Sequence, residues 1–175
     1  AKFIQEGTYK YIPYNKLFRR TEFLEVEGYG KFEGYANRDS LKYRSIYGLD
    51  DALTLYRGTI RRIGFSKSWN MFVQLGMTDD TYTIDNSETI SYREFVNLFL
   101  PYHPTDPVEI KLQLSLEIEQ DDIMWDKLME LDLLNPKKIV GLKQATPAQI
   151  LEKILTDSWK LQATDKDMIV MYHKF

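Results

Sequence analysis

The sequence predicts an α+β protein in which a mostly antiparallel or mixed sheet is covered by helices on one face. Three observations predict this class. The first 60 or so residues are rich in aromatic and β-branched side chains that partly alternate, as strands do. From about residue 89 onward the spacing and capping signals are those of helices. The final MIVMYHKF has strand character again, so the order is strands, helices and one more strand.

Two segments near the start are the clearest strands, FIQEGTYKYIP and EFLEVEGYGKFEGYA. Glycines 28, 30 and 34 in the second segment mark bulges or close backbone approach. A short helix is expected next, with Asp39 as its cap and Gly48 beyond its end. ALTLYRGTIR is then expected to be a strand and SKSWNMFVQLG a helix.

The later region carries explicit helix starts. Ser91 and Glu94 in SYRE form a capping box, and Thr146 with Gln149 repeats the pattern. VEIKLQLSLEI alternates like a strand, but its residue types and the preceding Asp-Pro favour a helix over that alternative. DDIMWDKLMELDLL is expected to be helical, and the final DMIVMYHKF is expected to return to the sheet as a strand.

Composition restricts the class of protein. The chain of 175 residues, 43% of them apolar, is long enough for one hydrophobic core, and no apolar stretch is long enough to span a bilayer. A net charge of −3 gives no support to nucleic-acid or membrane-surface binding. The absence of cysteine excludes disulfides and thiolate sites and is compatible with the cytoplasm, the location we expect. The sequence begins with Ala-Lys rather than with methionine and ends within an expected strand, so we expect it to be a piece of a larger protein.

Charge is unevenly distributed along the chain. Residues 31–67 hold eight Lys or Arg against four Asp or Glu, a local charge of +4. Residues 106–132 hold nine acids against two lysines, a local charge of −7, which we interpret as a solvated helix face. The first block needs another explanation, because its arginines lie among apolar and small residues.

Other motifs favour a structural role over a catalytic one. GYGKFEG approaches a dinucleotide-binding glycine pattern, but its spacing is off by one and a strand follows it, so no helix N-terminus would receive a pyrophosphate. His103 and His173 have no partner at metal-ligand spacing. The residues identify no nucleophile, no acid–base pair and no metal site, so the catalytic residues stay unknown.

YANRDS and RGTIR are the candidate site. Along an extended segment Arg57, Thr59 and Arg61 share one face, so Arg61 and Thr59 would meet the same ligand. Arg38 would join them from the loop before the short helix. A guanidinium binds a carboxylate through two parallel hydrogen bonds, and Gly58 allows close approach to the backbone. A polyanionic small molecule would fit this set, although composition alone leaves structural ion pairing open as the alternative.

These motifs resemble a known family. EGYANRDSLKYRSIYGLDDALTLYRGTIRRIGFSKSWNMFVQLG is similar to the catalytic domain of glutamate-forming saccharopine dehydrogenases, also called saccharopine reductases. The family pattern is close to Y-P-N-R-D-S, followed by an R-G-T-L-R-Y strand and by G-F with a helix. KDMIVM resembles the family's strand after a variable helical region. Ala36 replaces the usual proline and Arg62 the usual tyrosine.

The resemblance implies an oxidoreductase of lysine metabolism that interconverts saccharopine with glutamate and aminoadipate semialdehyde, using NAD or NADP. It implies that the carboxylates of saccharopine are held by Arg38, Thr59, Ile60 and Arg61. The family's N-terminal Rossmann domain is absent from this chain, so we expect the fragment to bind no cofactor and to be inactive alone. Residues 1–175 would form one substrate-binding and dimerisation domain with a helical insertion at about 89–163.

The expected partners are therefore saccharopine or a similar polycarboxylate, the protein's own Rossmann domain and a second copy joined through the sheet. Nucleic acid and membranes are not expected partners. Two alternatives stay open. A related imine reductase, such as a carboxynorspermidine-type dehydrogenase, would use the same arginines on other carboxylates. A non-catalytic dimerisation module would present an apolar sheet surface without an open pocket at Arg38 and Arg61.

Overall fold

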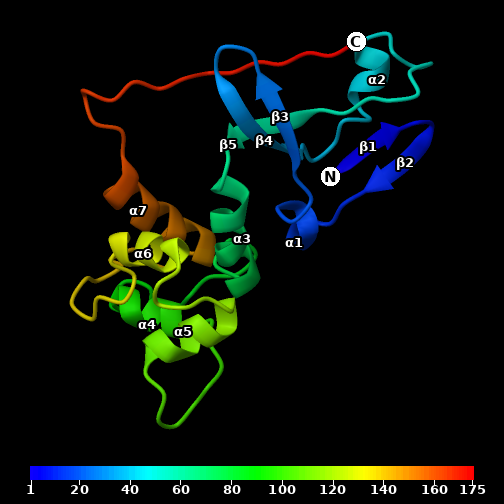
Figure 1. Ribbon diagram of the computed structural model, residues 1–175. Coiled ribbons are helices and arrows are strands. Elements are labelled where there is room, and N and C mark those ends of the chain that lie inside the picture. Colours follow the sequence, from blue (N-terminus) through cyan, green and yellow to red (C-terminus); the bar gives the residue numbers. More distant parts are fainter. The chain divides into compact units, whose positions relative to one another are not determined.

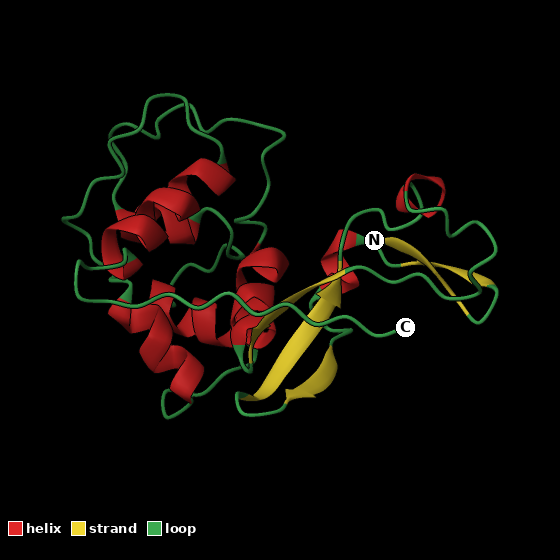
Figure 2. Cartoon of the chain, turned by 90° about the horizontal axis from the view of Figure 1, so that it is seen from above, coloured by secondary structure: helices red, strands yellow, loops and turns green.

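The computed structural model describes residues 1–175 (Figure 1). The chain divides into two compact units, Ala1–Asn70 with Asp167–Phe175, and Met71–Lys166. All the strands belong to the first unit, and four of the helices belong wholly to the second (Figure 2). The predicted α+β class is confirmed. None of the helices combines the length and the apolar character needed to cross a membrane.

The first unit begins with a two-stranded antiparallel hairpin of β1 (Lys2–Gln5) and β2 (Thr8–Tyr11). Its two turn residues, Glu6 and Gly7, have φ angles of 50° and 73°. This left-handed pair gives the turn a twist that suits a two-residue hairpin loop. The predicted strand segment FIQEGTYKYIP is therefore two strands, because the Glu-Gly pair interrupts it.

A three-stranded antiparallel sheet follows the one-turn helix α1 (Tyr14–Leu17). Its order is β3 (Glu22–Val26), β4 (Gly30–Ala36) and β5 (Gly58–Arg62), which leaves β5 with a free edge. Across β4 and β5, Tyr35 lies opposite Thr59 and Glu33 opposite Arg61. Residues opposite each other share a face of the sheet, so these four side chains belong to one face.

Aromatic rings cover this face of the three-stranded sheet. Tyr35 packs edge-on to Phe18, with ring centroids 4.9 Å apart, and stacks with Phe65 at 6.2 Å. Phe65 in turn stacks on Trp69 at 6.0 Å. These aromatic side chains thus fill the space between the sheet and the start of α3 (Phe65–Leu75).

A buried carboxylate ties β4 to the start of α3. Glu33 is only 4% exposed, and its two carboxylate oxygens accept hydrogen bonds from the backbone N–H groups of Gly64, at 3.2 Å, and Ser66, at 2.5 Å. The first amides of a helix lack partners within the helix and carry a partial positive charge. Glu33 therefore satisfies two amides at the beginning of α3 and fixes the direction in which the chain leaves β5.

The loop between β4 and β5 carries the predicted short helix, α2 (Tyr43–Ile46). Asp39 accepts hydrogen bonds from the backbone N–H groups of Leu41 and Lys42, and Gly48 ends the segment with a φ of 65°. The expected cap and end are thus both present, although the helix is one turn long.

The second unit is helical, with α4 (Tyr92–Asn97), α5 (Val108–Leu116), α6 (Ile123–Glu130) and α7 (Pro147–Trp159). Both predicted capping boxes are present at the starts of α4 and α7. The segment VEIKLQLSL, which alternates like a strand, forms α5. Its residue types and the helix start before it therefore indicated its structure better than its periodicity did. The fully buried centre of this unit includes Phe95, Val96, Leu128, Leu131, Val140, Ile150 and Ile154.

Three expectations about strands are wrong in detail. The strands form two sheets rather than one. The strand expected over ALTLYRGTIR begins only at Gly58, and before it Leu55 makes a single bridge to Ile4. The tail, residues 167–175, is not a strand. Its backbone N–H groups form no hydrogen bonds with the sheet, and Ile169 and Met171 are 86% and 75% exposed, so neither pairing nor burial holds it.

Candidate substrate-binding site

A hollow of about 880 Å³ lies in the first unit along β5. Residues 55–61 contribute to its lining from the end of the β4–β5 loop and from the strand, and residues 168–175 contribute from the tail. Asn37, Tyr47 and Leu49 complete it. We call this feature the arginine hollow, after Arg57 and Arg61.

The arginine hollow brings together three of the four predicted substrate-binding residues. Thr59, Ile60 and Arg61 all line it. Thr59 is half-buried, and its hydroxyl donates a 2.8 Å hydrogen bond to Oδ1 of Asn37. Arg38 is not among the lining residues; its side chain is exposed, and its backbone carbonyl accepts a 3.0 Å hydrogen bond from the N–H of Lys2. The loop that carries Arg38 therefore reaches the hollow through Asn37.

Arg61 forms no ion pair. The carboxylate nearest to it by strand pairing is Glu33, whose oxygens are occupied by the amides of Gly64 and Ser66. The guanidinium carbon of Arg61 lies 5.1 Å from the ring centroid of Phe65, a cation–π contact. This contact restrains the side chain without neutralising its charge, so the charge is available to an anion.

The charged side chains that line the hollow are all cationic. Arg57, Arg61 and Lys174 bring cationic side chains, His173 adds an imidazole, and none of the lining residues is Asp or Glu. Positive groups in a concavity without acidic partners raise the local concentration of anions. Arginine adds geometric selectivity, because its planar fork matches the two oxygens of a carboxylate. The hollow is thus suited to a ligand with carboxylate groups.

Tyr56 also lines the hollow, although no feature of the sequence pointed to it as a site residue. Burial, with a further contribution from the negative charge of Glu22, raises the pKa of Tyr56 to about 12. Its hydroxyl therefore stays protonated at neutral pH, where it can donate a hydrogen bond to a ligand but cannot act as a ready base. Its ring packs edge-on against Phe3, with centroids 5.1 Å apart.

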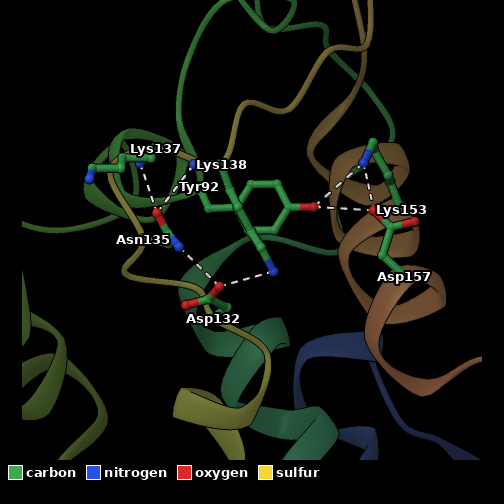
Figure 3. A network of polar contacts seen from close by, with 7 residues as sticks. All are labelled: Tyr92, Asp132, Asn135, Lys137, Lys138, Lys153 and Asp157. Carbon is green, nitrogen blue, oxygen red and sulfur yellow. Dashed lines mark hydrogen bonds and ion pairs between the residues drawn. The ribbon is translucent and has the colours of Figure 1, made fainter.

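A second polar cluster, in the helical unit, is internally satisfied (Figure 3). Tyr92 donates to Oδ2 of Asp157 at 3.2 Å, and Lys153 pairs with the same carboxylate at 2.6 Å. Lys138 pairs with Asp132 at 2.9 Å. These contacts raise the pKa of both lysines and lower the pKa of both aspartates. With its charges paired, the cluster joins α4, α7 and residues 132–138 and offers no free group to a ligand.

The remaining candidates do not form a site. No three His, Asp or Glu side chains come together in an arrangement that could hold a metal ion. His103 lies in an exposed loop, where its Nδ1 accepts a 3.1 Å hydrogen bond from the N–H of Asp106 and lies 3.3 Å from that residue's carboxylate. The arginine hollow is therefore the candidate functional site.

The fold and this hollow define an α+β domain with a concavity that is lined by cationic side chains. The whole chain, residues 1–175, matches the model of the saccharopine dehydrogenase C-terminal domain. The chain belongs to this family.

Individual relatives agree with the family. The chain is 31% identical over 147 residues to the mouse alpha-aminoadipic semialdehyde synthase, mitochondrial, and covers 16% of that protein. It is 25% identical over 183 residues to the Saccharomyces cerevisiae saccharopine dehydrogenase [NADP(+), L-glutamate-forming] and covers 40% of it. The solved apo structure of the S. cerevisiae saccharopine dehydrogenase (L-Glu forming) superposes with a TM-score of 0.71 over 93% of this chain and 37% of that one, at 22% identity, which supports the fold. The chain thus spans less than half the length of these relatives.

Proposed function

We propose that this chain is the substrate-binding domain of an NAD(P)-dependent saccharopine dehydrogenase, which converts saccharopine to L-glutamate and aminoadipate semialdehyde in lysine metabolism. The observation that carries the proposal is the arginine hollow, in which Arg61 and Thr59 lie together and no Asp or Glu is among the lining residues. Saccharopine carries three carboxylates, and a concavity with unpaired guanidinium groups suits such a ligand. Family membership supports the same reaction class.

In this proposal each predicted residue has a defined task. Arg61 binds one carboxylate with its guanidinium, while the backbone and side chains of Thr59 and Ile60 form the wall beside it. Arg38 follows Asn37, which accepts the hydrogen bond of Thr59, and in this proposal its exposed side chain contacts the ligand from beside the hollow. Tyr56 donates a hydrogen bond from its protonated hydroxyl.

The nicotinamide cofactor belongs to another part of the protein in this proposal. Every strand pair in this chain is antiparallel, so the chain contains no βαβ unit to receive a dinucleotide. When bound to a Rossmann domain of the same polypeptide, the cofactor would supply hydride acceptance. The names of the yeast relatives include NADP(+), which supports a nicotinamide cofactor. We therefore propose that this chain alone binds saccharopine but does not oxidise it.

Assembly and location are part of the proposal. Large apolar side chains are exposed on the strands of the first unit, among them Phe23 at 70% and Tyr11 at 68%. Exposed apolar side chains occur on both sheets of this unit, which supports a homodimer through it. We propose the cytoplasm as the location, although the mouse relative's name places that protein in mitochondria.

The test is a steady-state assay of the full-length enzyme that joins this chain to its dinucleotide-binding domain. With saccharopine as substrate and NAD or NADP as acceptor, Arg61→Met is expected to raise KM or lower kcat/KM by about tenfold or more, the loss of one charge-assisted contact. Arg62→Met is the matched control, because Arg62 is the next residue of β5 and does not line the hollow.

Two further measurements separate the alternatives. In the same assay Arg38→Lys is expected to lower kcat/KM, because lysine keeps the charge but loses the bidentate geometry. Unchanged turnover in Arg38→Lys would remove Arg38 from the site. Carboxynorspermidine replaces saccharopine in a parallel assay. Turnover of carboxynorspermidine alone would reassign the enzyme to the related imine reductases, and turnover of neither substrate would contradict the proposal.

A further inference from the structure

The arginine hollow contains a second guanidinium, that of Arg57, which the family motif does not assign to the substrate. Arg57 precedes β5, is half-buried and lines the hollow. No Asp or Glu forms an ion pair with it. Its guanidinium carbon lies 3.7 Å from the ring centroid of Tyr43, close above the face of the ring. The charge is thus restrained by an aromatic face and left without a carboxylate.

The backbone of Arg57 is fixed as firmly as its side chain. Its N–H donates a 3.0 Å hydrogen bond to Oγ of Ser40, a residue with no exposed surface. Its carbonyl accepts a 2.8 Å hydrogen bond from the N–H of Asn37. Arg57 is therefore held from both sides by the β4–β5 loop, whereas Arg61 is held within the sheet. A cation on a fixed backbone with an aromatic support loses little conformational entropy when it binds an anion.

The spacing of the two arginines sets the kind of ligand. Arg57, Thr59 and Arg61 alternate along an extended segment and so project to one side. Four residues at the rise of a strand separate the two arginines by about 13 Å between Cα atoms. A short dicarboxylate spans much less than this separation, so it would reach both guanidinium groups only if the two side chains turned towards each other. An extended molecule with a carboxylate at each end can reach both.

We propose that the arginine hollow is a two-ended site in which Arg57 binds one terminal carboxylate of an extended ligand and Arg61 binds the other, with Thr59 between them. This inference rests on the proposed function, because it concerns how the same hollow holds its substrate. It gives the guanidinium of Arg57 a role in binding the ligand. Saccharopine, an extended molecule with carboxylates at both ends, is a ligand of this class.

The test uses ligand length. Straight-chain dicarboxylates from glutarate to sebacate, and then saccharopine, are titrated into this chain by isothermal calorimetry at low ionic strength. Affinity is expected to rise with length, with sebacate bound about tenfold more tightly than glutarate once both ends are engaged. In Arg57→Met the preference for length is expected to disappear, because only one end is bound. If Arg57→Met keeps the full length preference, apolar contact explains that preference and the two-ended site is wrong.

Controls distinguish this inference from the proposed function. Arg62→Met is expected to leave the length series unchanged, and Arg57→Lys, which keeps a cation, is expected to retain part of the preference. Thermal unfolding of each variant shows whether the contact with Tyr43 is needed for the fold. Saccharopine binding that falls in Arg61→Met but not in Arg57→Met overturns the two-ended site and leaves the proposed function standing. Failure of the unmodified chain to bind saccharopine or any dicarboxylate overturns both.

Discussion

Gly58 is a residue of the arginine hollow at which a side chain would meet neighbouring atoms closely. A Cβ atom at this position would lie 2.8 Å from Cε1 of Tyr56 and 2.9 Å from the carbonyl oxygen of Tyr35. The tyrosine ring is held against Phe3, and the carbonyl belongs to the neighbouring strand, so neither atom moves freely. Close approach, rather than an unusual φ, is therefore the reason for glycine here.

Gly58→Ala is accordingly expected to lower the free energy of unfolding by about 1–3 kcal/mol, the usual cost of forcing an extra methyl group into packed structure. Urea denaturation of the variant measures this loss. Gly34→Ala on β4 is the matched control, since its Cβ would meet Leu24 at an ordinary 3.4 Å. Equal losses in the two variants would show that the contact with Tyr56 is not the cause.

Among single residues, the sequence predicted the shared strand face of Thr59 and Arg61, while their role in binding a ligand stays a prediction. Thr59 and Arg61 share a face and a hollow because the segment is extended, and alternation follows from that alone. Arg38 was placed with them from its nearness in a loop, and the folded loop instead turns Asn37 towards the hollow. The contribution of Tyr56 had no local signal, because its neighbours Phe3 and Glu22 come from distant parts of the sequence.

At the scale of elements, α4 and α5 are joined by a bidentate ion pair. The two terminal nitrogens of Arg93 donate to the two carboxylate oxygens of Glu109 at 2.5 and 2.8 Å. These hydrogen bonds lower the pKa of Glu109 below its usual value. Because the folded pKa is the lower one, the pair stabilises the protein above the pKa of an unfolded glutamate, and this stability is lost as pH falls through the folded pKa.

We therefore expect Arg93→Met to cost about 0.5–1 kcal/mol of unfolding free energy at neutral pH, a small figure because both side chains are partly exposed and screened by solvent. The difference from the unmodified chain should shrink as the pH is lowered through the folded pKa of Glu109, because the carboxylate then becomes protonated and the ion pair is lost. Unfolding curves at several pH values measure it. Lys127→Met, which breaks an exposed pair within α6, serves as control. A difference that stays constant with pH would exclude the ion pair as its origin.

Elements that are determined by residues close together in the sequence were predicted more accurately than elements that depend on distant partners. The capping boxes at Ser91 and Thr146 are set by residues three positions apart, and both helices start where expected. The three-stranded sheet and the tail depend on distant partners. Residues 52–57 have strand-forming composition but make only one bridge, from Leu55 to Ile4, and the tail makes none. The carboxylate of Glu33 at the start of α3 is likewise a contact between distant segments, which residue type alone does not reveal.

At the scale of the whole molecule, the two compact units hold different features. The arginine hollow is built entirely within the unit formed by Ala1–Asn70 and Asp167–Phe175. The predicted helical insertion at about 89–163 falls inside the other unit, Met71–Lys166, whose charges pair internally around Tyr92. The family assignment covers both units, while the proposed contact with substrate concerns the first alone.

Binding of saccharopine by Arg57 and Arg61 is tested most directly by an NMR titration of this chain with saccharopine, in which the arginine side-chain Nε–Hε signals are followed. The signals of Arg61 and Arg57 are expected to shift and saturate together, while those of Arg62 and of Arg20, an exposed arginine outside the hollow, are expected to stay in place. Signals of Arg61 that do not move at saturating saccharopine, or equal shifts at all four arginines, would contradict this expectation.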